Sequence, residues 1–195
     1  MKAFLYPVFR ALSRSLYVFL YRPDIKGQEN IPTSGPVIIA ANHIAKIDVC
    51  PGVISCNRPI RFLAKDTFME KPVLHLLFNG VGCIKVNSSG KSPEAIRTAE
   101  ETLKKGAVVG IFPEGKRNKA SSALLPFHYG AVRFARDTGA PIVPCGISGT
   151  YRLFGNSLRV RYGQTLYVSE EEDLTEANER LKKEIEALRG GEEPR

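Results

Sequence analysis

The sequence predicts a single α/β domain: a mostly parallel or mixed sheet covered by helices, preceded by an amphipathic helix at a membrane interface. Three observations indicate this class. Short apolar runs alternate with helical stretches, Gly, Pro, Asn or Ser bounds each run, and no linker or repeat divides the 195 residues. We therefore expect an interfacial helix at 1–22 and one domain at 23–195.

The N-terminal segment is rich in aromatic and aliphatic residues, carries Arg10, Arg14 and Arg22, and has no acid before Asp24. A membrane-spanning helix needs about 20 mainly apolar residues, so the internal arginines argue against one. They also interrupt the apolar core that a secretory signal requires. The pattern favours a helix lying in the interface of a membrane. The alternative is a helix packed on the core of its own domain.

The apolar runs that follow predict buried strands at 37–41, 60–64, 83–86, 107–112 and 141–146, with further strands at 158–163 and 165–169. Helices are expected at 49–56, 72–78, 92–105, 125–138 and 174–188. Ser92 and Pro93 are typical of a helix start, and Gly106 is typical of a helix end.

Composition excludes a coiled coil, a collagen-like repeat and a disordered tail protein, because 43% of residues are apolar and 25% are charged. The net charge of +8 combines a basic body with a C-terminal segment, from residue 169, that is acidic. A basic body fits an anionic partner, such as a phospholipid surface, a phosphorylated small molecule or nucleic acid. The four cysteines form no CxxC pair, so we expect free thiols in a reducing cytoplasm and no metal site.

Polar residues follow the first buried strand, where active residues of such sheets gather. His43 and Asp48 are separated by four residues, which on one continuous helix would place them on different sides. They can meet if His43 lies in a turn and Asp48 begins the next helix. An ionised Asp48 could then hold the imidazole in one tautomer and leave its other nitrogen free to accept a proton. The alternative is a helix cap at Asp48 and a hydrogen-bonded turn residue at His43.

A second polar exit follows the strand at 107–112. It contains Glu114, Gly115, Lys116 and Arg117 after Pro113, and so combines a carboxylate, a tight turn and two cations. This composition favours an anion-binding loop. The alternative is a solvated basic loop whose cations pair with Glu114.

The chain from about Gly27 to about Gly149 resembles the glycerolipid acyltransferase family, which includes the PlsC-like 1-acylglycerol-3-phosphate acyltransferases. The family's histidine and aspartate motif corresponds to His43 and Asp48. Its Phe-Pro-Glu-Gly block stands at 112–115, its Val-Pro pair at 143–144, and its lead-in resembles Gly27 to Pro32. The order and spacing of these blocks carry the resemblance.

The resemblance implies an O-acyltransferase at the cytoplasmic face of a membrane, with no cofactor. His43 would be the general base and Asp48 its orienting partner, while the acyl group comes from acyl-CoA or acyl carrier protein. The acceptor would be a lysophospholipid, most directly 1-acyl-sn-glycerol-3-phosphate, giving phosphatidic acid. Membrane lipids and the acyl carrier are thus the implied partners, and nucleic acid is not.

One family block differs in this chain. Relatives commonly carry an arginine, thought to bind the acceptor phosphate, where this sequence has Ser88. Serine supplies no charge, so Lys85, Lys91 or Arg117 would have to replace it, or the acceptor differs. Lys65 is a further candidate phosphate contact. For Lys65 and Lys85 the alternative is a solvated lysine at the end of a strand.

Four other classes of protein share some features with the sequence. Ser89 to Ser92 resembles a phosphate-binding loop, but Lys85 stands where its first glycine belongs. Residues 146–150 resemble a Gly-x-Ser-x-Gly hydrolase motif but end in Thr150. A cysteine nucleophile lacks a neighbouring histidine in the sequence. A non-catalytic basic module that binds membranes stays open as the alternative to an enzyme.

Overall fold

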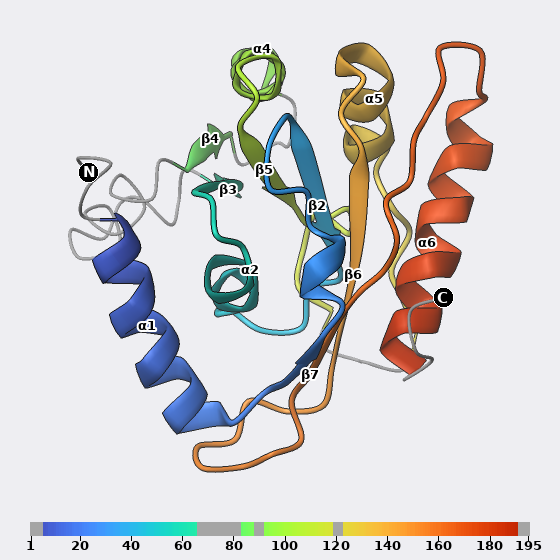
Figure 1. Cartoon of the computed structure of the whole chain (residues 1–195). Helices are drawn as coiled ribbons and strands as arrows, with labels where there is room; N and C mark the ends of the chain where they lie inside the picture. Colours follow the sequence, from blue (N-terminus) through green and yellow to red (C-terminus); the bar gives the residue numbers. More distant parts are fainter. Residues whose placement is uncertain (1–5, 66–82, 88–91, 119–122, 191–195) are drawn as a thin grey trace.

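The computed structural model describes residues 6–65, 83–87, 92–118 and 123–190. The predicted helix at 72–78, together with Ser88 and Lys91, lies outside the described residues. Figure 1 shows helices on both sides of a central sheet, with α1 along one flank and α6 along the other.

The described strands form one seven-stranded sheet in the order β1-β7-β6-β2-β5-β3-β4 (Figure 1). Their bounds are β1 Asp24–Lys26, β2 Val37–Ala41, β3 Ile60–Lys65, β4 Ile84–Val86, β5 Val108–Ile111, β6 Ile142–Ser148 and β7 Arg159–Tyr162. Neighbouring strands run parallel, except for β6 and β7, which are antiparallel. The predicted class, a mostly parallel mixed sheet in an α/β domain, is confirmed.

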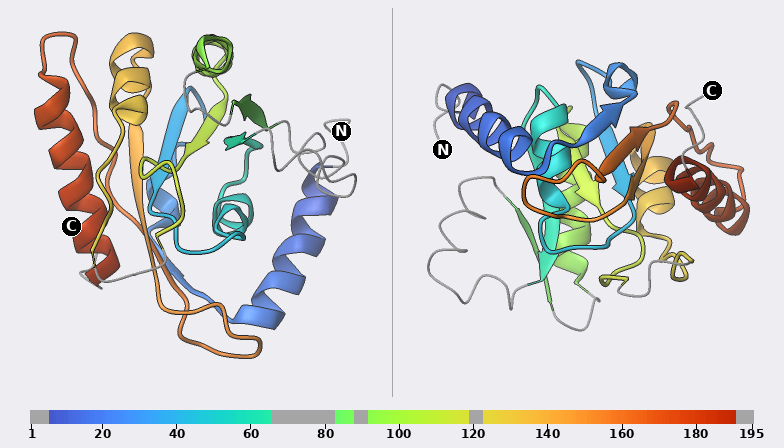
Figure 2. Two further views of the ribbon diagram at one scale, coloured as in Figure 1. Left: turned by 180° about the vertical axis from the view of Figure 1, so that it is seen from behind. Right: turned by 90° about the horizontal axis from the view of Figure 1, so that it is seen from below.

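The helices divide into two layers (Figure 2). The layer of α4, α5 and α6 covers one face, and α1 and α2 lie on the other. Their bounds are α1 Tyr6–Tyr21, α2 Val49–Ser55, α4 Pro93–Lys104, α5 Gly130–Thr138 and α6 Leu174–Gly190, and a short 3-10 turn, η2, spans Gln28–Asn30. This arrangement buries both faces of the sheet, as a parallel sheet requires.

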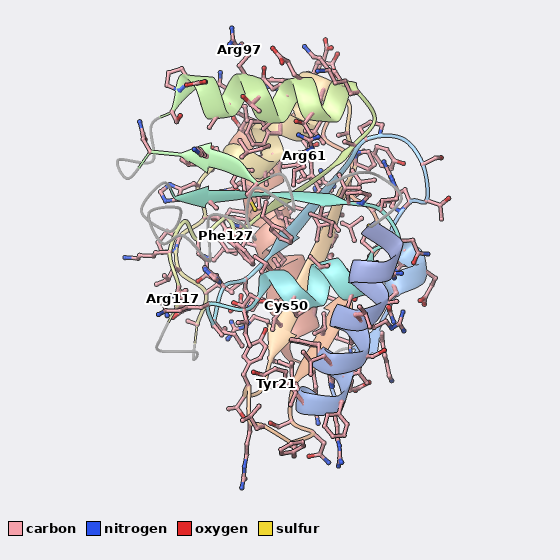
Figure 3. The ribbon with its side chains drawn as sticks, turned by 90° about the vertical axis from the view of Figure 1, so that its left-hand side faces the viewer. Tyr21, Cys50, Arg61, Arg97, Arg117 and Phe127 are labelled. Atoms are coloured by element: carbon pink, nitrogen blue, oxygen red, sulfur yellow. The ribbon has the colours of Figure 1, made fainter. Side chains whose placement is uncertain are left out.

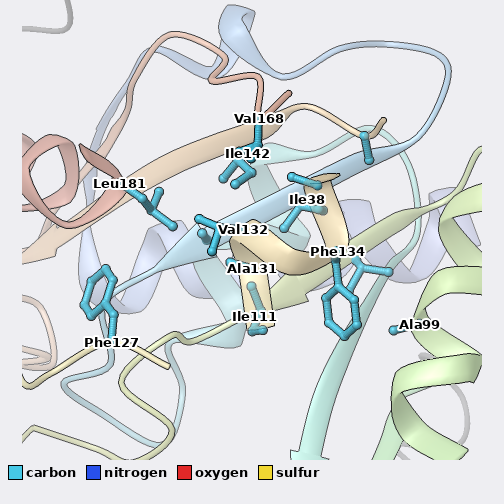
Figure 4. Packing of buried hydrophobic residues seen from close by; sticks show 14 of the residues in the cluster. Ile38, Ala99, Ile111, Phe127, Ala131, Val132, Phe134, Ile142, Val168 and Leu181 are labelled. Atoms are coloured by element: carbon cyan, nitrogen blue, oxygen red, sulfur yellow. The ribbon is translucent and has the colours of Figure 1, made fainter. Parts of the chain in front are cut away.

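Two hydrophobic clusters follow from the alternation of side chains along the strands. Ile38 of β2 faces the layer of α5 and α6, where Val132 and Leu181 meet it (Figure 4). Its neighbour Ile39 faces α2 and packs with Ile54. Because the central strands bury both faces, their sequences read as continuous apolar runs, which explains why sequence analysis locates them.

The strand predicted at 165–169 is wrong. The segment makes only an isolated antiparallel bridge, from Leu166 to Ile142. The pair Cys145 and Tyr162 is the nearest regular pair of the ladder. The segment from Tyr162 to Leu166 is one residue longer than the segment of β6 from Ile142 to Cys145 that it faces, so it contains a bulge. Pro144 lies in this interval and has no N–H, so a regular ladder would lack a donor there. The missed strand β1 is a short polar segment at the sheet edge, paired with β7.

The helix predicted from residue 125 begins at Gly130 instead. Pro126 disfavours a helical conformation at Leu125, and the chain through Phe127 runs in an irregular path. By contrast, α4 starts as predicted, because the Ser92 hydroxyl accepts a hydrogen bond from the Ala95 N–H.

The N-terminal helix α1 packs on its own domain, as the alternative interpretation of its sequence expected, and the interfacial role stays a prediction. Tyr17 is buried against the domain, and the Arg10 guanidinium donates to the Ile54 carbonyl of α2 at 3.1 Å. The opposite side of the helix leaves Leu12, Leu16 and Phe19 exposed. Among the described residues, no helix is long and apolar enough to cross a membrane.

Candidate active site

The turn that carries His43 begins where β2 ends. After Ala41, the Asn42 side chain pairs with the backbone of Ile147 in β6: its Nδ2 donates to the carbonyl at 2.9 Å and its Oδ1 accepts from the N–H at 2.7 Å. Asn42 is buried. Its amide therefore continues the pairing of β2 with β6 for one step while the backbone turns away toward His43.

Asp48 stands immediately before α2, at the N-cap position, but its side chain makes no capping bond to that helix. Instead, Oδ2 accepts from His43 Nδ1 at 2.7 Å and from the N–H groups of Ile44 and Ala45 at 2.6 and 2.8 Å. The predicted placement, a histidine in the turn and an aspartate at the helix start, is what the structure shows. The carboxylate is directed at the turn rather than at the helix.

This geometry decides which nitrogen of His43 can act. An ionised Asp48 only accepts hydrogen bonds, so Nδ1 must carry the proton that it donates. The neutral ring then has its lone pair on Nε2. Within the described residues, Nε2 has no hydrogen-bond partner. The pair therefore presents a basic nitrogen held in one tautomer.

The ring of His43 lies on an aromatic stack. Its centroid is 4.2 Å from that of Phe112 with an interplanar angle of 16°, and Phe62 stacks beyond Phe112. The His43 side chain is 19% exposed, whereas that of Asp48 is fully buried. The imidazole thus has a fixed apolar face and partial access to solvent, which a base acting on an external substrate requires.

Glu114 braces the turn from the loop that follows the neighbouring strand β5. It is 2% exposed, and its two oxygens accept from the N–H groups of His43 and Leu125, each at 2.9 Å. The Asn118 N–H donates to the His43 carbonyl at 2.7 Å. Among the described residues, Glu114 therefore pairs with backbone N–H groups and not with the loop cations Lys116 and Arg117. The irregular path before α5 places Leu125 where it can bind this carboxylate.

The cations predicted beside Glu114 lie on the same loop. Lys116 is exposed and Arg117 is half-buried, and Figure 3 shows Arg117 toward the end of α2 that carries Cys50. Gly115 has a φ of 65°, and a Cβ there would lie 2.8 Å from His128 Cδ2. Glycine is therefore needed at this bend for both its conformation and its size.

The remaining predicted contacts are more distant or undescribed. Lys85 is exposed in β4, the strand at the sheet edge, with β3 and β5 between it and β2. Lys65 ends β3, and its side chain is not described. The structure therefore brings together His43, Asp48 and the loop of Glu114, and leaves Lys85 on the edge strand away from them.

Sequence reasoning missed Tyr151, whose hydroxyl donates to Asp48 Oδ1 at 2.6 Å. Burial and the nearby Asp48 charge raise the pKa of Tyr151 far above its usual value. No local motif marks this residue, since it lies 103 positions from Asp48. A signal was available only in its position just after β6, the neighbour of β2.

The four cysteines are free thiols, as expected. Burial raises the pKa of Cys50 and of Cys83 to about 11 and raises that of Cys145 as well. A protonated thiol is a poor nucleophile, so none of these three fits a thiolate mechanism. Among the described residues, no group of three or more His, Cys, Asp or Glu could hold a metal ion.

A cavity of about 330 Å³ lies under α1, at the end of α2 opposite Asp48. Arg10, Arg14 and Arg58 contribute to its lining, together with Glu29. The guanidinium of Arg58 donates to the carbonyls of Pro32, Gly35 and Gly106. Since α2 separates this cavity from the His43 turn, we treat the two as different features.

Comparisons with known proteins give a matching family model and related sequences. The family model described as Acyltransferase matches residues 22–148. A 1-acyl-sn-glycerol-3-phosphate acyltransferase of Borreliella burgdorferi is 30% identical over 156 residues, which cover 79% of this chain and 62% of that protein. A chloroplastic 1-acyl-sn-glycerol-3-phosphate acyltransferase of Brassica napus is 33% identical over 144 residues, 72% of this chain and 41% of that protein.

The chain thus spans about two fifths to three fifths of the length of these curated relatives. Among solved structures, the 1-acyl-sn-glycerophosphate acyltransferase PlsC of Thermotoga maritima superposes with a TM-score of 0.74 at 23% identity. The superposition covers 94% of this chain and 79% of the other. At this identity the likeness establishes the fold.

Proposed function

Since the chain belongs to the acyltransferase family, we propose that it transfers a fatty acyl group from an acyl thioester to the free hydroxyl of a lysophospholipid. The proposed acceptor is 1-acyl-sn-glycerol-3-phosphate, giving phosphatidic acid, in keeping with the names of its relatives. The observation that carries the proposal is the 2.7 Å contact between His43 Nδ1 and Asp48 Oδ2, which leaves Nε2 without a partner among the described residues.

In the proposed mechanism, His43 Nε2 removes the proton of the acceptor hydroxyl as its oxygen attacks the thioester carbonyl. The tetrahedral intermediate collapses with cleavage of the carbon–sulfur bond, forming the ester. The departing thiolate takes the proton back from the imidazolium, so the products are the acylated lipid and a free thiol. Asp48 stabilises the imidazolium between these two steps. Neither an acyl-enzyme nor a cofactor is needed.

We assign the acceptor phosphate to the loop that follows β5. The Asn118 N–H bonded to the His43 carbonyl fixes this loop beside the base. Lys116 and Arg117 supply charge, and Gly115 allows the backbone to approach an anion closely. Glu114 contributes by bracing this loop against the histidine turn, because both its oxygens are already used.

Access to lipid substrates is assigned to an apolar surface at the C-terminal end of α1. We call it the lipid-facing surface. Phe19 and Phe154 meet edge to face at 5.6 Å, and Arg22 and Arg152, which follow Phe19 and precede Phe154 closely in the chain, are exposed. Its members are large apolar side chains between 56% and 68% exposed: Leu12, Leu16, Phe19, Leu153 and Phe154. Apolar groups with exposed arginines nearby suit the surface of an anionic bilayer, so we propose peripheral contact with the cytoplasmic face.

The test is incubation of the full chain with a labelled acyl-CoA or acyl carrier protein and a panel of lysolipids presented in mixed micelles. The panel pairs each acceptor that has a phosphate monoester with one that lacks it. We expect thiol release and labelled diacyl product with 1-acyl-sn-glycerol-3-phosphate. Transfer to another lysolipid alone would keep the reaction and change the acceptor, as Ser88 in place of arginine allows. No transfer to any acceptor would favour a non-catalytic membrane-binding module.

A further inference from the structure

Tyr151 is the partner of Asp48 that no sequence motif indicates. Asp48 Oδ2 already accepts three hydrogen bonds, from His43 Nδ1 and two backbone N–H groups. Among the described residues, the hydroxyl of Tyr151 is the partner of the other oxygen, Oδ1, at 2.6 Å. The terminal torsion of an aspartate has a broad energy well, so the carboxylate can still rock while Oδ2 keeps these three bonds. The bond from Tyr151 narrows this motion, because it holds the second oxygen.

The hydroxyl of Tyr151 can only act as the donor in this contact. Burial raises its pKa far above the usual value, and the Asp48 charge raises it further, so the phenol stays protonated at any physiological pH. A hydrogen bond to an ionised group is shorter and stronger than one between neutral groups. The short distance agrees with a charge-assisted bond to the ionised carboxylate.

Two tyrosines of α1 hold Tyr151 in place. The ring of Tyr21 meets that of Tyr151 at 5.7 Å with an interplanar angle of 83°, and Tyr17 packs on Tyr21 at 5.0 Å. Tyr17 is buried, and its pKa is raised by burial. One hydrogen bond also joins the loop of Tyr151 to α1: the Phe154 N–H donates to the Leu20 carbonyl at 2.6 Å. In Figure 1 the loop between β6 and β7 runs beside the C-terminal end of α1.

We infer that Tyr151 is a positioning residue for the acyl transfer: its hydroxyl fixes the rotation of the Asp48 carboxylate, so that Oδ2 stays on His43 Nδ1 and aims Nε2 at the substrate. The inference rests on the proposed function of the His43 and Asp48 pair. It also connects the lipid-facing surface to the chemistry, because the loop that contributes Leu153 and Phe154 to that surface carries Tyr151.

The effect on pH dependence follows from the charges around Asp48. Among the residues that the structure describes, the titratable groups that face it are His43 of its own turn, Tyr17 of α1, Cys50 of α2, Cys145 of β6 and Tyr151. Burial keeps the tyrosines and thiols neutral through the assay range. Without the Tyr151 hydroxyl, the Asp48 carboxylate would lose one hydrogen bond, so its negative charge would stabilise the protonated form of His43 more strongly. The acid limb of kcat/KM should then move to higher pH.

The experiment compares Tyr151→Phe with Tyr21→Phe in the full chain on mixed micelles of 1-acyl-sn-glycerol-3-phosphate and acyl-CoA. Both variants remove one phenol hydroxyl from the same aromatic cluster, but the hydroxyl that bonds to Asp48 is that of Tyr151 and not that of Tyr21. For Tyr151→Phe we expect kcat to fall about 10-fold, since the bond lost is to a charged group. We expect KM to stay within about 2-fold, because Tyr151 does not touch substrate, and Tyr21→Phe to match the wild type.

A second comparison separates positioning from a general effect on folding. If Tyr151 acts through Asp48, then Tyr151→Phe has no further effect on kcat in an Asp48→Asn background, whereas a general loss of packing adds to it. Equal kcat and an unmoved acid limb in Tyr151→Phe and Tyr21→Phe, or additive losses in the cycle, would overturn the inference while leaving the proposed reaction intact. A wild-type chain as inactive as His43→Ala would instead overturn the reaction, and this inference with it.

Discussion

The histidine turn and the lipid-facing surface lie on the same side of the domain, yet they are built in opposite ways. In the turn, Asn42, Asp48 and Glu114 are each at most 2% exposed, and each has its side-chain oxygens satisfied by hydrogen bonds. At the surface, the large side chains Leu16 and Phe19 are mostly exposed to solvent. The turn depends on single atoms, whereas the surface depends on summed apolar area.

This difference predicts how each region responds to substitution. Buried polar networks lose much when one partner is removed, because the other partner stays buried and unsatisfied. Exposed apolar groups contribute in proportion to the area that they bury in the bilayer, so each loss is moderate and the losses add. Changes in the turn should therefore alter the chemical step, and changes at the surface should alter membrane binding.

The largest expected effect is that of His43→Ala. Removal of a positioned general base lowers kcat by about 10² to 10⁴-fold. Binding to vesicles should stay at the wild-type level, because His43 lies outside the lipid-facing surface. Turnover is measured by thiol release and binding by vesicle sedimentation. Near-normal kcat in this variant would remove the basis for assigning the base.

The next effect should fall on membrane binding alone. The double variant Leu153→Ser and Phe154→Ser replaces two exposed apolar side chains, and we expect about 10 to 100-fold weaker partitioning to anionic vesicles. Raised salt should weaken the wild type less than the substitution does, because apolar burial is not screened. Tyr167→Ser is the matched control, since Tyr167 is 66% exposed but lies outside this surface. If Tyr167→Ser weakened vesicle partitioning as much as the double variant does, the assignment of membrane binding to this surface would be wrong.

Glu114→Gln tests whether the turn is held as a unit. The amide nitrogen of Gln would face one of two backbone N–H donors, those of His43 and Leu125, and leave it unsatisfied. We expect the free energy of unfolding to drop by about 1–3 kcal/mol, measured by urea denaturation. Glu101→Gln on the exposed surface of α4 should change it by no more than about 0.5 kcal/mol. Similar losses in both variants would contradict the bracing role.

The smallest effect concerns the thiols. Because burial raises the pKa of Cys50 and Cys83 to about 11, the reactive thiolate is scarce at pH 8. Alkylation there should be roughly 10²-fold slower than for an exposed thiol of pKa about 8.5. The rate should keep rising until the pH passes the raised pKa, and Cys83→Ser should keep wild-type turnover. Fast alkylation at pH 8 with loss of activity would restore a cysteine mechanism.

Much of the fold could be predicted from local pattern. The central strands β2, β5 and β6 are buried on both faces, so their apolar runs are unambiguous. The pair His43 and Asp48 was accessible for a related reason: a strand, a turn and a helix start follow one another directly in the chain. Local order in the sequence was enough to place both groups at one point.

What escaped prediction depends on contacts between distant segments. β1 exists because Asp24–Lys26 can pair with β7, and nothing in those three residues marks a strand. Tyr151 reaches Asp48 only because β6 lies beside β2 in the sheet. The Leu125 N–H reaches Glu114 only because the fold brings the segment before α5 against the loop after β5, which is a tertiary contact. Spacing along the chain contains none of this information.

The two hydrogen bonds between the Asn42 side chain and the Ile147 backbone also determine how β2 ends. A primary amide has the same donor and acceptor as a peptide group, so here a side chain completes the final rung of the ladder. The main chain is released one residue early, and the peptide groups of His43 are available to Glu114 and Asn118. Because the Asn42 amide replaces a peptide group, β2 can end here without leaving the N–H and carbonyl of Ile147 unsatisfied. The reactive side chain of His43 then occupies the first position after the strand pairing.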